Sequence, residues 1–327
     1  MHSPATVDNL ESALERAVSR FDDGSATSAQ MRYHLGFAPG GCRGERLHAR
    51  LVLAAAEGEG ARVEDALDAA CAVEIVREFA LVHADIEDGD VVRRACETVW
   101  SRFGLAHGIN AGDALCAVAY LALLDGTATR PPDVTVAMTR RLHEAHLAMC
   151  GGHSRNIAFR GRPLVSPAEY RAMMDGKTAA LFGAACELGA RCAGAGSERA
   201  GAYAQLGRAY GTAFHIEDDV LRTWGEPAAA NPGMLPPTWS FPVVWAIAGP
   251  PSQARDTIAA AYASPSAFDG PTAAAVVAAL DALGAREAAS RATRAELDGA
   301  DAVAQAFGID RSERVRALCQ QALRRVA

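Results

Sequence analysis

Apolar residues recur at three- and four-residue spacing along most of the chain. The clearest runs cover residues 51–60, 65–90, 109–124 and 178–194. This spacing places the apolar side chains on one face of an α-helix. Alternation with a period of two is nowhere sustained, so we expect no sheet of any size. The pattern therefore predicts an all-α fold.

Clusters of Gly and Pro interrupt the helical pattern at five places. They lie at residues 37–44, 124–133, 160–170, 224–239 and 262–272, and such clusters mark turns and loops. None of them is long or polar enough to be a domain linker. We therefore expect a tail and first helix over residues 1–29, followed by one helical domain over residues 30–327.

Composition and charge exclude several classes of partner. The chain has 327 residues, half of them hydrophobic, and a formal net charge of -7 at pH 7. Nucleic acids and anionic membranes attract clustered Lys and Arg, which this balance does not supply. The longest uninterrupted apolar stretch, residues 114–124, is shorter than the ~20 residues that span a bilayer. We expect a soluble cytoplasmic protein with no nucleic-acid partner and no stable membrane insertion.

The eight cysteines show no CxxC pairing. Most of them lie in Ala-rich apolar segments, where free Cys behaves as a small hydrophobic residue. In a cytoplasmic protein disulfides are rare. We expect all eight to be reduced core residues.

Two acidic clusters adjoin strongly apolar helical segments. The first, residues 85–90, contains Asp85 and Asp88, which share a helix face, and the second contains Asp218 and Asp219. A run of carboxylates usually lies on a solvated outer face. A cation between the two clusters is the alternative. Oxygen-only ligands with room for water and phosphate oxygens suit Mg²⁺.

Basic residues near these clusters point to a phosphate or diphosphate ester as the ligand. Arg93 and Arg94 follow the first cluster. Lys177 is the single lysine among the 32 basic side chains, which indicates a site that requires a compact ammonium group. We also expect Lys177 to open a helix, whose free N–H groups would favour an anion.

Three segments together resemble the trans-isoprenyl diphosphate synthase family. They are VHADIEDGDVVRRACETVWSRFGLAHGINAGDAL, MMDGKTAALFGAACELGA and GTAFHIEDDVL, and the resemblance runs from about residue 30 to the C-terminus. It implies a single-domain isoprenoid synthase bundle around a deep apolar cavity, and a homodimer. It also implies up to three Mg²⁺ ions that hold the diphosphate of an allylic prenyl substrate. The implied metal ligands are Asp85, Asp88, Asp218 and Asp219, and the implied diphosphate contacts are Lys177, Arg93, Arg94 and Arg46.

The same resemblance assigns the apolar part of the site. Phe79 lies five residues before Ala84, where the family limits prenyl length, which implies a substrate of about C10 to C20 in a cavity of fixed depth. Aromatic side chains can also stabilise a carbocation, although core packing is the other interpretation for each of them. The candidates are Trp100, Phe182, Phe214, Trp224, Trp239 and Trp245.

The sequence departs from the family in its metal ligands. Ala84 stands where the first Asp of the Asp-Asp-x-x-Asp motif is expected, so one ligand is missing. In the second motif Arg222 stands where the family often has a third Asp. We expect Asp85, Asp88, Asp218, Lys177 and Arg93 to be the catalytic residues that remain.

The larger departure concerns isopentenyl diphosphate, the acceptor in chain elongation. The family binds it with a Gly-Lys-Arg-x-Arg-Pro segment, a His on the helix before the first motif, and an Arg after that motif. Here Glu45 takes the Lys place, Arg46 is retained, His48 takes an Arg place and Arg77 takes the His place. The later Lys-rich loop becomes residues 233–242, which contain no basic residue.

Exchanging Lys for Glu turns attraction into repulsion, worth roughly 4 kcal/mol per contact at ~4 Å for an effective dielectric constant of about 20. The sequence therefore predicts a disabled acceptor site. The leading hypothesis is a class I terpene synthase that cyclises, deprotonates or hydrates the prenyl cation. Three alternatives remain: a chain-elongating farnesyl or geranylgeranyl type of synthase, a transferase to an unusual acceptor, and a non-catalytic partner subunit.

Overall fold

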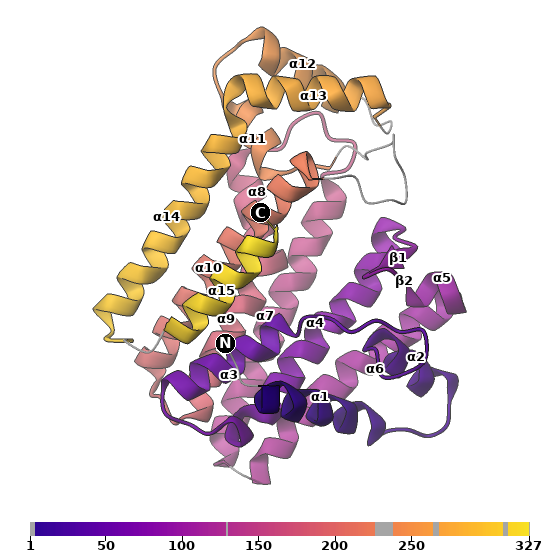
Figure 1. Cartoon of the computed structure of the whole chain (residues 1–327), viewed down its shortest axis with the longest axis vertical. Coiled ribbons are helices and arrows are strands. Elements are labelled where there is room, and N and C mark those ends of the chain that lie inside the picture. Colours follow the sequence, from indigo (N-terminus) through magenta and orange to yellow (C-terminus); the bar gives the residue numbers. More distant parts are fainter. Residues whose placement is uncertain (1–3, 129, 226–237, 264–267, 310–312, 327) are drawn as a thin grey trace. The chain divides into compact units, whose positions relative to one another are not determined.

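The structure, a computed structural model, describes residues 4–128, 130–225, 238–263, 268–309 and 313–326, and it is mainly helical (Figure 1). Its α-helices are α1 Pro4–Ser19, α2 Ala26–His34, α3 Leu47–Gly58, α4 Leu67–Asp88, α5 Val99–Phe103, α6 Leu105–Leu124, α7 Pro132–Ala158, α8 Pro167–Met174, α9 Ala180–Cys192, α10 Ser197–Trp224, α11 Phe241–Ala248, α12 Gln253–Tyr262, α13 Gly270–Leu283, α14 Ala285–Ala306 and α15 Glu313–Val326. Short helical turns are η1 Val63–Ala66, η2 Asp125–Ala128 and η3 Asp175–Ala179. Strands β1 Val92–Arg93 and β2 Cys96–Glu97 pair as an antiparallel hairpin.

These elements confirm the predicted all-α class. The four apolar runs correspond to α3, α4, α6 and α9. The boundary expected between residues 29 and 30 falls within α2. Two of the predicted breaks, at 224–239 and 262–272, lie partly outside the described residues, as does half of the segment 233–242.

The chain forms two compact units. Unit 1 comprises Met1–His146, Leu181–Gly207 and Ala304–Leu318, and unit 2 comprises Leu147–Ala180, Arg208–Val303 and Cys319–Ala327. The chain passes between them within α7, at the start of α9, within α10, within α14 and within α15. Unit 1 carries the first acidic cluster, and unit 2 carries the second cluster and Lys177.

The core of unit 1 is built around α4, which packs along α6 and α3. Small side chains on these helices let their backbones approach closely. The fully buried residues on α4 include Ala69, Ala70, Ala72, Val73 and Val76. Because apolar neighbours surround α4 on most of its length, a charged residue that is buried on this helix needs a partner.

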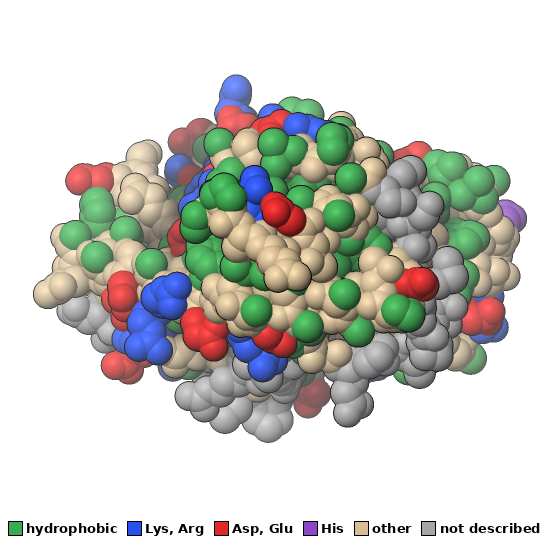
Figure 2. Space-filling view, turned by 90° about the horizontal axis from the view of Figure 1, so that it is seen from above, with side chains coloured by type: hydrophobic (Ala, Val, Ile, Leu, Met, Phe, Trp, Pro, Cys, Tyr) green, Lys and Arg blue, Asp and Glu red, His purple; other side chains and the backbone are tan. Residues whose placement is uncertain are grey.

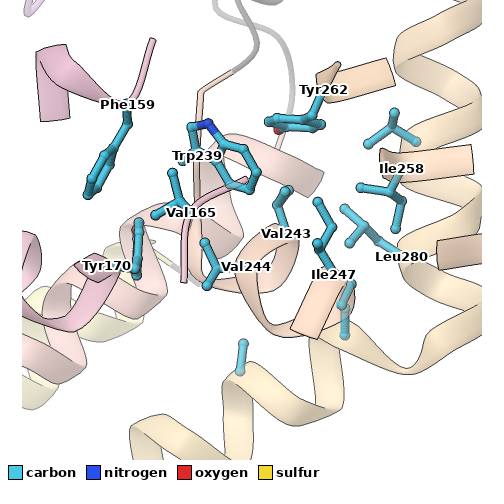
Figure 3. Packing of buried hydrophobic residues seen from close by; sticks show 14 of the residues in the cluster. Phe159, Val165, Tyr170, Trp239, Val243, Val244, Ile247, Ile258, Tyr262 and Leu280 are labelled. Atoms are coloured by element: carbon cyan, nitrogen blue, oxygen red, sulfur yellow. The ribbon is translucent and has the colours of Figure 1, made fainter. Parts of the chain in front are cut away.

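The core of unit 2 is a cluster of larger aromatic and aliphatic side chains (Figure 3). Trp239 packs on Tyr262 with ring centroids 5.0 Å apart, and Tyr262 packs edge-on against Phe268 at 5.2 Å. Ile216 of α10 and Tyr170 of α8 belong to the same cluster. The second acidic motif is therefore anchored on this apolar core.

Two of the eight cysteines form a disulfide, contrary to the expectation that all are reduced. Cys42, in the loop before α3, pairs with Cys96 of β2, and their Cα atoms are 6.0 Å apart. Cys71, Cys186 and Cys319 are buried thiols, as predicted, whereas the Cys150 thiol is exposed. The pairing escaped sequence reasoning because the two residues, 54 apart in sequence, meet only once the β1–β2 hairpin folds back.

Helix α6 is long and apolar enough to cross a membrane by length and composition alone. In its most apolar window 44 % of the residues are buried inside the structure, and α6 packs along α4. Core helices of soluble proteins share this length and composition, so α6 by itself is weak evidence for a membrane span. On the face drawn in Figure 2, basic and acidic side chains of the described residues are interspersed with hydrophobic ones.

Candidate active site

Three carboxylates lie on one buried face of α4. Glu74, Glu78 and Asp85 are spaced by four and seven residues, which brings them onto the same side of a helix. All three are buried, whereas Asp88, the last helical residue, is exposed. Gly89 ends the helix with φ 71°, a left-handed conformation that glycine adopts without strain. Asp85 and Asp88 therefore differ strongly in their surroundings.

The β1–β2 hairpin places Arg93 on the first acidic motif. Its Nε lies 2.5 Å from Asp85 Oδ1, and its Nη2 lies 3.3 Å from Asp90 Oδ2. Burial raises the pKa of the Asp85 carboxyl, and the nearby Arg93 charge opposes that shift. The other oxygen, Asp85 Oδ2, is buried and has no hydrogen-bond partner among the described residues. That orphaned oxygen is suited to a cation.

The other two predicted diphosphate ligands of unit 1, Arg94 and Arg46, are held in ion pairs with carboxylates instead. Arg94 binds Glu78 through both nitrogens, at 3.1 and 2.8 Å. Arg46 lies 4.0 Å from Glu78 and binds Glu11 at 2.9 and 3.3 Å. His34 Nε2 lies 2.8 Å from Glu78 Oε2. We call Glu78, His34, Arg46 and Arg94 the Glu78 cluster.

The two remaining acceptor positions differ in charge. Burial, followed by the charge of Arg77, lowers the pKa of His48 to about 3, so its ring is neutral near pH 7. Burial also lowers the pKa of Arg77, but a guanidinium stays protonated in a protein, so Arg77 keeps its positive charge. Glu45 is exposed, and the buried anion of this region is Glu78. Sequence reasoning missed Glu78, although its i, i+4 spacing from Glu74 in an apolar helix was a readable signal.

Phe79 is buried, as expected for a residue that lines an apolar cavity. Its ring meets His83 and His146 edge-on, at centroid distances of 4.9 and 4.8 Å. The Tyr120 hydroxyl lies 2.9 Å from His146 Nδ1. The side chains that pack against Phe79 in unit 1 thus include two further rings.

The second acidic motif in unit 2 has one buried and one partly exposed carboxylate. Asp219 Oδ2 accepts hydrogen bonds from the Tyr170 hydroxyl and from the Phe241 backbone N–H, the latter at 2.8 Å. Burial raises the pKa of Asp219 to about 7. Asp218 is partly exposed and binds Arg222 Nε at 2.8 Å. An exposed i, i+4 pair is worth only about 0.3–0.5 kcal/mol, so Asp218 can exchange Arg222 for a stronger cation.

Lys177 lies within a π-helical turn, η3, and this corrects one prediction. Ser166 caps the helical run, and α8, η3 and α9 continue without a break from Pro167 to Cys192. Lys177 therefore does not open a helix, and no free N–H groups of a helix start surround it. Single π-turns inside helices recur at functional sites. The backbone of α7 approaches this turn closely at Gly152. A Cβ on Gly152 would lie 2.1 Å from the backbone nitrogen of Lys177.

His215 is a further polar residue of unit 2 that sequence reasoning did not single out. Its Nδ1 lies 2.6 Å from Thr178 Oγ1, and its Nε2 lies 3.3 Å from the Tyr170 hydroxyl. Burial, followed by the charge of Lys177, lowers the pKa of His215 to about 3. A neutral imidazole thus links the Lys177 turn to the second acidic motif.

The donor set fits magnesium in part. Among the described residues, no three acidic, His or Cys side chains gather closely enough to hold an ion by themselves. Mg²⁺ is typically held by one or two carboxylates together with water and substrate phosphates. Asp85, with its orphaned oxygen, and the partly exposed Asp218 meet that requirement in their own units. Metal binding by the four predicted ligands stays a prediction.

Comparison with known proteins agrees with this arrangement. The family model described as polyprenyl synthetase matches residues 37–269. The chain is 36 % identical to a geranylgeranyl diphosphate synthase of Mycobacterium tuberculosis over 265 residues, which cover 78 % of this chain and 74 % of that protein. The chain belongs to the polyprenyl synthetase family. The resemblance stated from the sequence motifs is therefore confirmed.

Other members of the polyprenyl synthetase family give the same result. A (2E,6E)-farnesyl diphosphate synthase of Mycobacterium bovis is 37 % identical over 226 residues, which cover 66 % of this chain and 62 % of that protein. A solved polyprenyl synthetase from Streptomyces coelicolor superposes with a TM-score of 0.82, at 29 % identity over 97 % of this chain and 98 % of that one. A geranylgeranyl pyrophosphate synthase with 23 % identity shares the fold, with a TM-score of 0.87 over 99 % of each chain.

Within this family fold, most of the candidate cation-facing aromatic residues have structural roles. Trp239 and Phe182 are buried, and Phe182 packs edge-on against His48. Trp100 donates to the Asp90 carbonyl, and Trp224 donates to Asp281. Phe214, directly before His215, is half-buried, and its place in substrate binding stays a prediction.

Proposed function

We propose that the chain is a Mg²⁺-dependent prenyl diphosphate synthase that joins isopentenyl diphosphate to an allylic diphosphate of about C10 to C20. The observation that carries the proposal is the 36 % identity to a geranylgeranyl diphosphate synthase over three quarters of both chains. The relatives thus favour the chain-elongating alternative over the terpene synthase that the sequence motifs led us to expect first.

The proposed chemistry assigns tasks to residues of both units. Asp85, Asp88 and Asp218 would bind magnesium, and Arg93 and Lys177 would contact the diphosphate oxygens. Bound magnesium would stabilise the charge on the departing pyrophosphate. The double bond of the acceptor would then attack the allylic carbon, and loss of a proton would complete the longer diphosphate. Phe79 would limit its length.

A second candidate function is a terpene synthase that releases a hydrocarbon or an alcohol. The Glu78 cluster favours it, because Arg94 and Arg46 are already neutralised by carboxylates. A cation that meets no acceptor must cyclise, lose a proton or react with water. The two functions share the first step and differ only in the fate of the cation.

One experiment separates these functions. The purified protein is incubated with geranyl, farnesyl or geranylgeranyl diphosphate, with and without isopentenyl diphosphate and Mg²⁺, and the products are identified by mass spectrometry. Longer diphosphates that form only with isopentenyl diphosphate and Mg²⁺ are the expected result. Hydrocarbons or alcohols formed equally without isopentenyl diphosphate would overturn the proposal in favour of the terpene synthase, and no turnover at all would overturn both.

A further inference from the structure

Glu78 lies at the centre of three basic side chains. It is fully buried, and it contacts both terminal nitrogens of Arg94, the ring of His34 and, at 4.0 Å, the guanidinium of Arg46. Although burial alone would raise the pKa of the Glu78 carboxyl, His34 and Arg94 hold it well below its usual value. The Glu78 carboxylate therefore occupies the position at which Arg94 and Arg46 would otherwise bind an anionic ligand.

The backbone around this cluster is strained in a way that supports a specialised arrangement. The non-glycine residues with positive φ among the described residues are Arg46, Arg94 and Ala95, at 54°, 53° and 63°. Such conformations persist only where the surrounding structure enforces them. Two of these three residues, Arg46 and Arg94, are the arginines that contact Glu78.

The loop before α3, which contains Cys42 and Gly44, lies close to Arg94. A Cβ on Gly44 would lie 2.5 Å from the guanidinium carbon of Arg94. The disulfide between Cys42 and Cys96 joins this loop to the hairpin that carries Arg94. Both features place this loop close to Arg94.

Little room or charge remains for a second anion here. The cavity lined by Asp85, Arg93, Arg94 and the disulfide has a volume of about 20 Å³, which is room for about one water molecule. The three arginines of this region, Arg46, Arg77 and Arg94, are matched by three glutamates. These are Glu11, Glu74 and Glu78.

We propose that Glu78 is a built-in anion that competes with the acceptor diphosphate for Arg94 and Arg46, and so sets how often a bound prenyl cation is elongated. The inference rests on the proposed function for its catalytic meaning, although its binding claim can be tested without turnover. Glu78 would lower the affinity for isopentenyl diphosphate and leave the allylic site unaffected. The ratio of elongated to acceptor-free products would follow from that affinity.

The test is calorimetric titration of isopentenyl diphosphate into wild type and Glu78→Gln in EDTA. Without metal, the acidic motifs cannot hold a diphosphate, so the titration reports on basic residues alone. Glu78→Gln keeps the shape of the side chain and removes its charge. We expect the variant to bind at least about tenfold more tightly than wild type, because its arginines no longer face a competing buried charge. Equal or weaker binding by a folded variant would overturn the proposal.

Glu187→Gln is the matched control. Glu187 is a buried carboxylate of the same unit, bound by Arg141 at 2.6 Å and Arg191 at 2.8 Å. Removing the Glu187 charge weakens a comparable pair of arginine contacts at a position outside the Glu78 cluster. Unchanged affinity is expected; a gain equal to that of Glu78→Gln would show a general charge effect and overturn the specific claim.

A second variant covers the case in which Glu78→Gln does not fold. Glu78→Asp keeps the charge but shortens the side chain, so it cannot hold Arg94 through both nitrogens. We expect Glu78→Asp to bind isopentenyl diphosphate more tightly than wild type, and no gain over wild type would count against the proposal. If wild type consumes no allylic diphosphate, the proposed function fails, whereas the titration still decides whether Glu78 blocks an anion site.

Discussion

Asp85 and Asp219 are the buried carboxylates of the two acidic motifs, and their neighbours give them different tasks. Asp85 pairs with Arg93 and keeps one oxygen without a partner among the described residues. Asp219 is engaged by Tyr170 and by the Phe241 backbone, which tie α10 to α8 and α11. In the second motif, Asp218 is therefore the carboxylate placed to exchange its partner for a metal ion.

Asp218→Ala is expected to lower kcat/KM for the allylic diphosphate by at least about a hundredfold, because a metal ligand acts on the charge of the leaving group. Asp88→Ala should lower kcat/KM for the allylic diphosphate to a similar extent. Asp256→Ala, an exposed aspartate on α12, is the control and should keep wild-type activity. Steady-state kinetics of pyrophosphate release measure all three, and full activity of Asp218→Ala would remove this residue from the site.

His48 should make the folded state sensitive to acid. Its pKa is about 3 when folded and near 6.5 when unfolded, so the unfolded chain binds the proton first. This contribution to stability is complete above pH 6.5 and is lost as the pH falls toward 3. Between pH 7.5 and 5, wild type should lose about 2 kcal/mol more unfolding free energy than His48→Gln. Urea titrations at both pH values measure this difference, and equal losses would show that His48 is not buried neutral.

The sequence predicted a negative charge in the acceptor region, but it did not predict which residue carries that charge. Glu45, chosen from the motif alignment, is exposed. Glu78 is the buried anion, and it receives Arg94 from a hairpin and Arg46 from the start of α3. Which cation a carboxylate meets depends on how distant segments fold together, and periodicity alone does not specify that.

The helices themselves followed from the apolar pattern, whereas the irregular elements did not. The runs that became α3, α4, α6 and α9 bury a continuous face, and that burial is visible in sequence spacing. The η3 turn depends on the close approach of Gly152 and Gly176, since a Cβ on Gly176 would lie 3.2 Å from the Cα and the backbone nitrogen of Gly152. Such tertiary contacts override local helical geometry, so Lys177 was predicted at a helix start and found inside a helical run.

Gly152→Ala should displace the Lys177 turn. A Cβ at position 152 would lie 2.1 Å from the backbone nitrogen of Lys177 and cannot be accommodated without backbone movement. We expect kcat/KM for the allylic diphosphate to fall by about tenfold to a hundredfold, since misplacing a positioning group by about 1 Å has effects of this size. Gly151→Ala is the matched control, because its Cβ would meet only the end of the Arg155 side chain at 3.3 Å. Equal activity of the two variants would contradict a role for the crossing.

For the whole molecule, α6 carries the surface that best suits the expected homodimer. Leu105, Ile109, Leu121 and Leu124 are each more than 40 % exposed on this helix. Large exposed apolar side chains on one helix are typical of a protein interface. The homodimer remains a proposal, and its second copy would cover this face.

The double variant Ile109→Glu, Leu121→Glu should be monomeric if α6 forms the dimer contact, because charged groups are costly in the core of an interface. Light scattering after gel filtration measures the mass of wild type and variant. Thr257→Glu, at an exposed position of α12, should leave the mass unchanged. A wild-type monomer, or a double variant that stays dimeric, would rule out this interface.

The most direct test of the account is the transfer of labelled isopentenyl diphosphate to farnesyl diphosphate by the wild-type protein. We predict that label enters longer allylic diphosphates, that EDTA abolishes this incorporation, and that Glu78→Gln increases it. Consumption of farnesyl diphosphate with no label in any product, in wild type and in Glu78→Gln alike, would contradict the account.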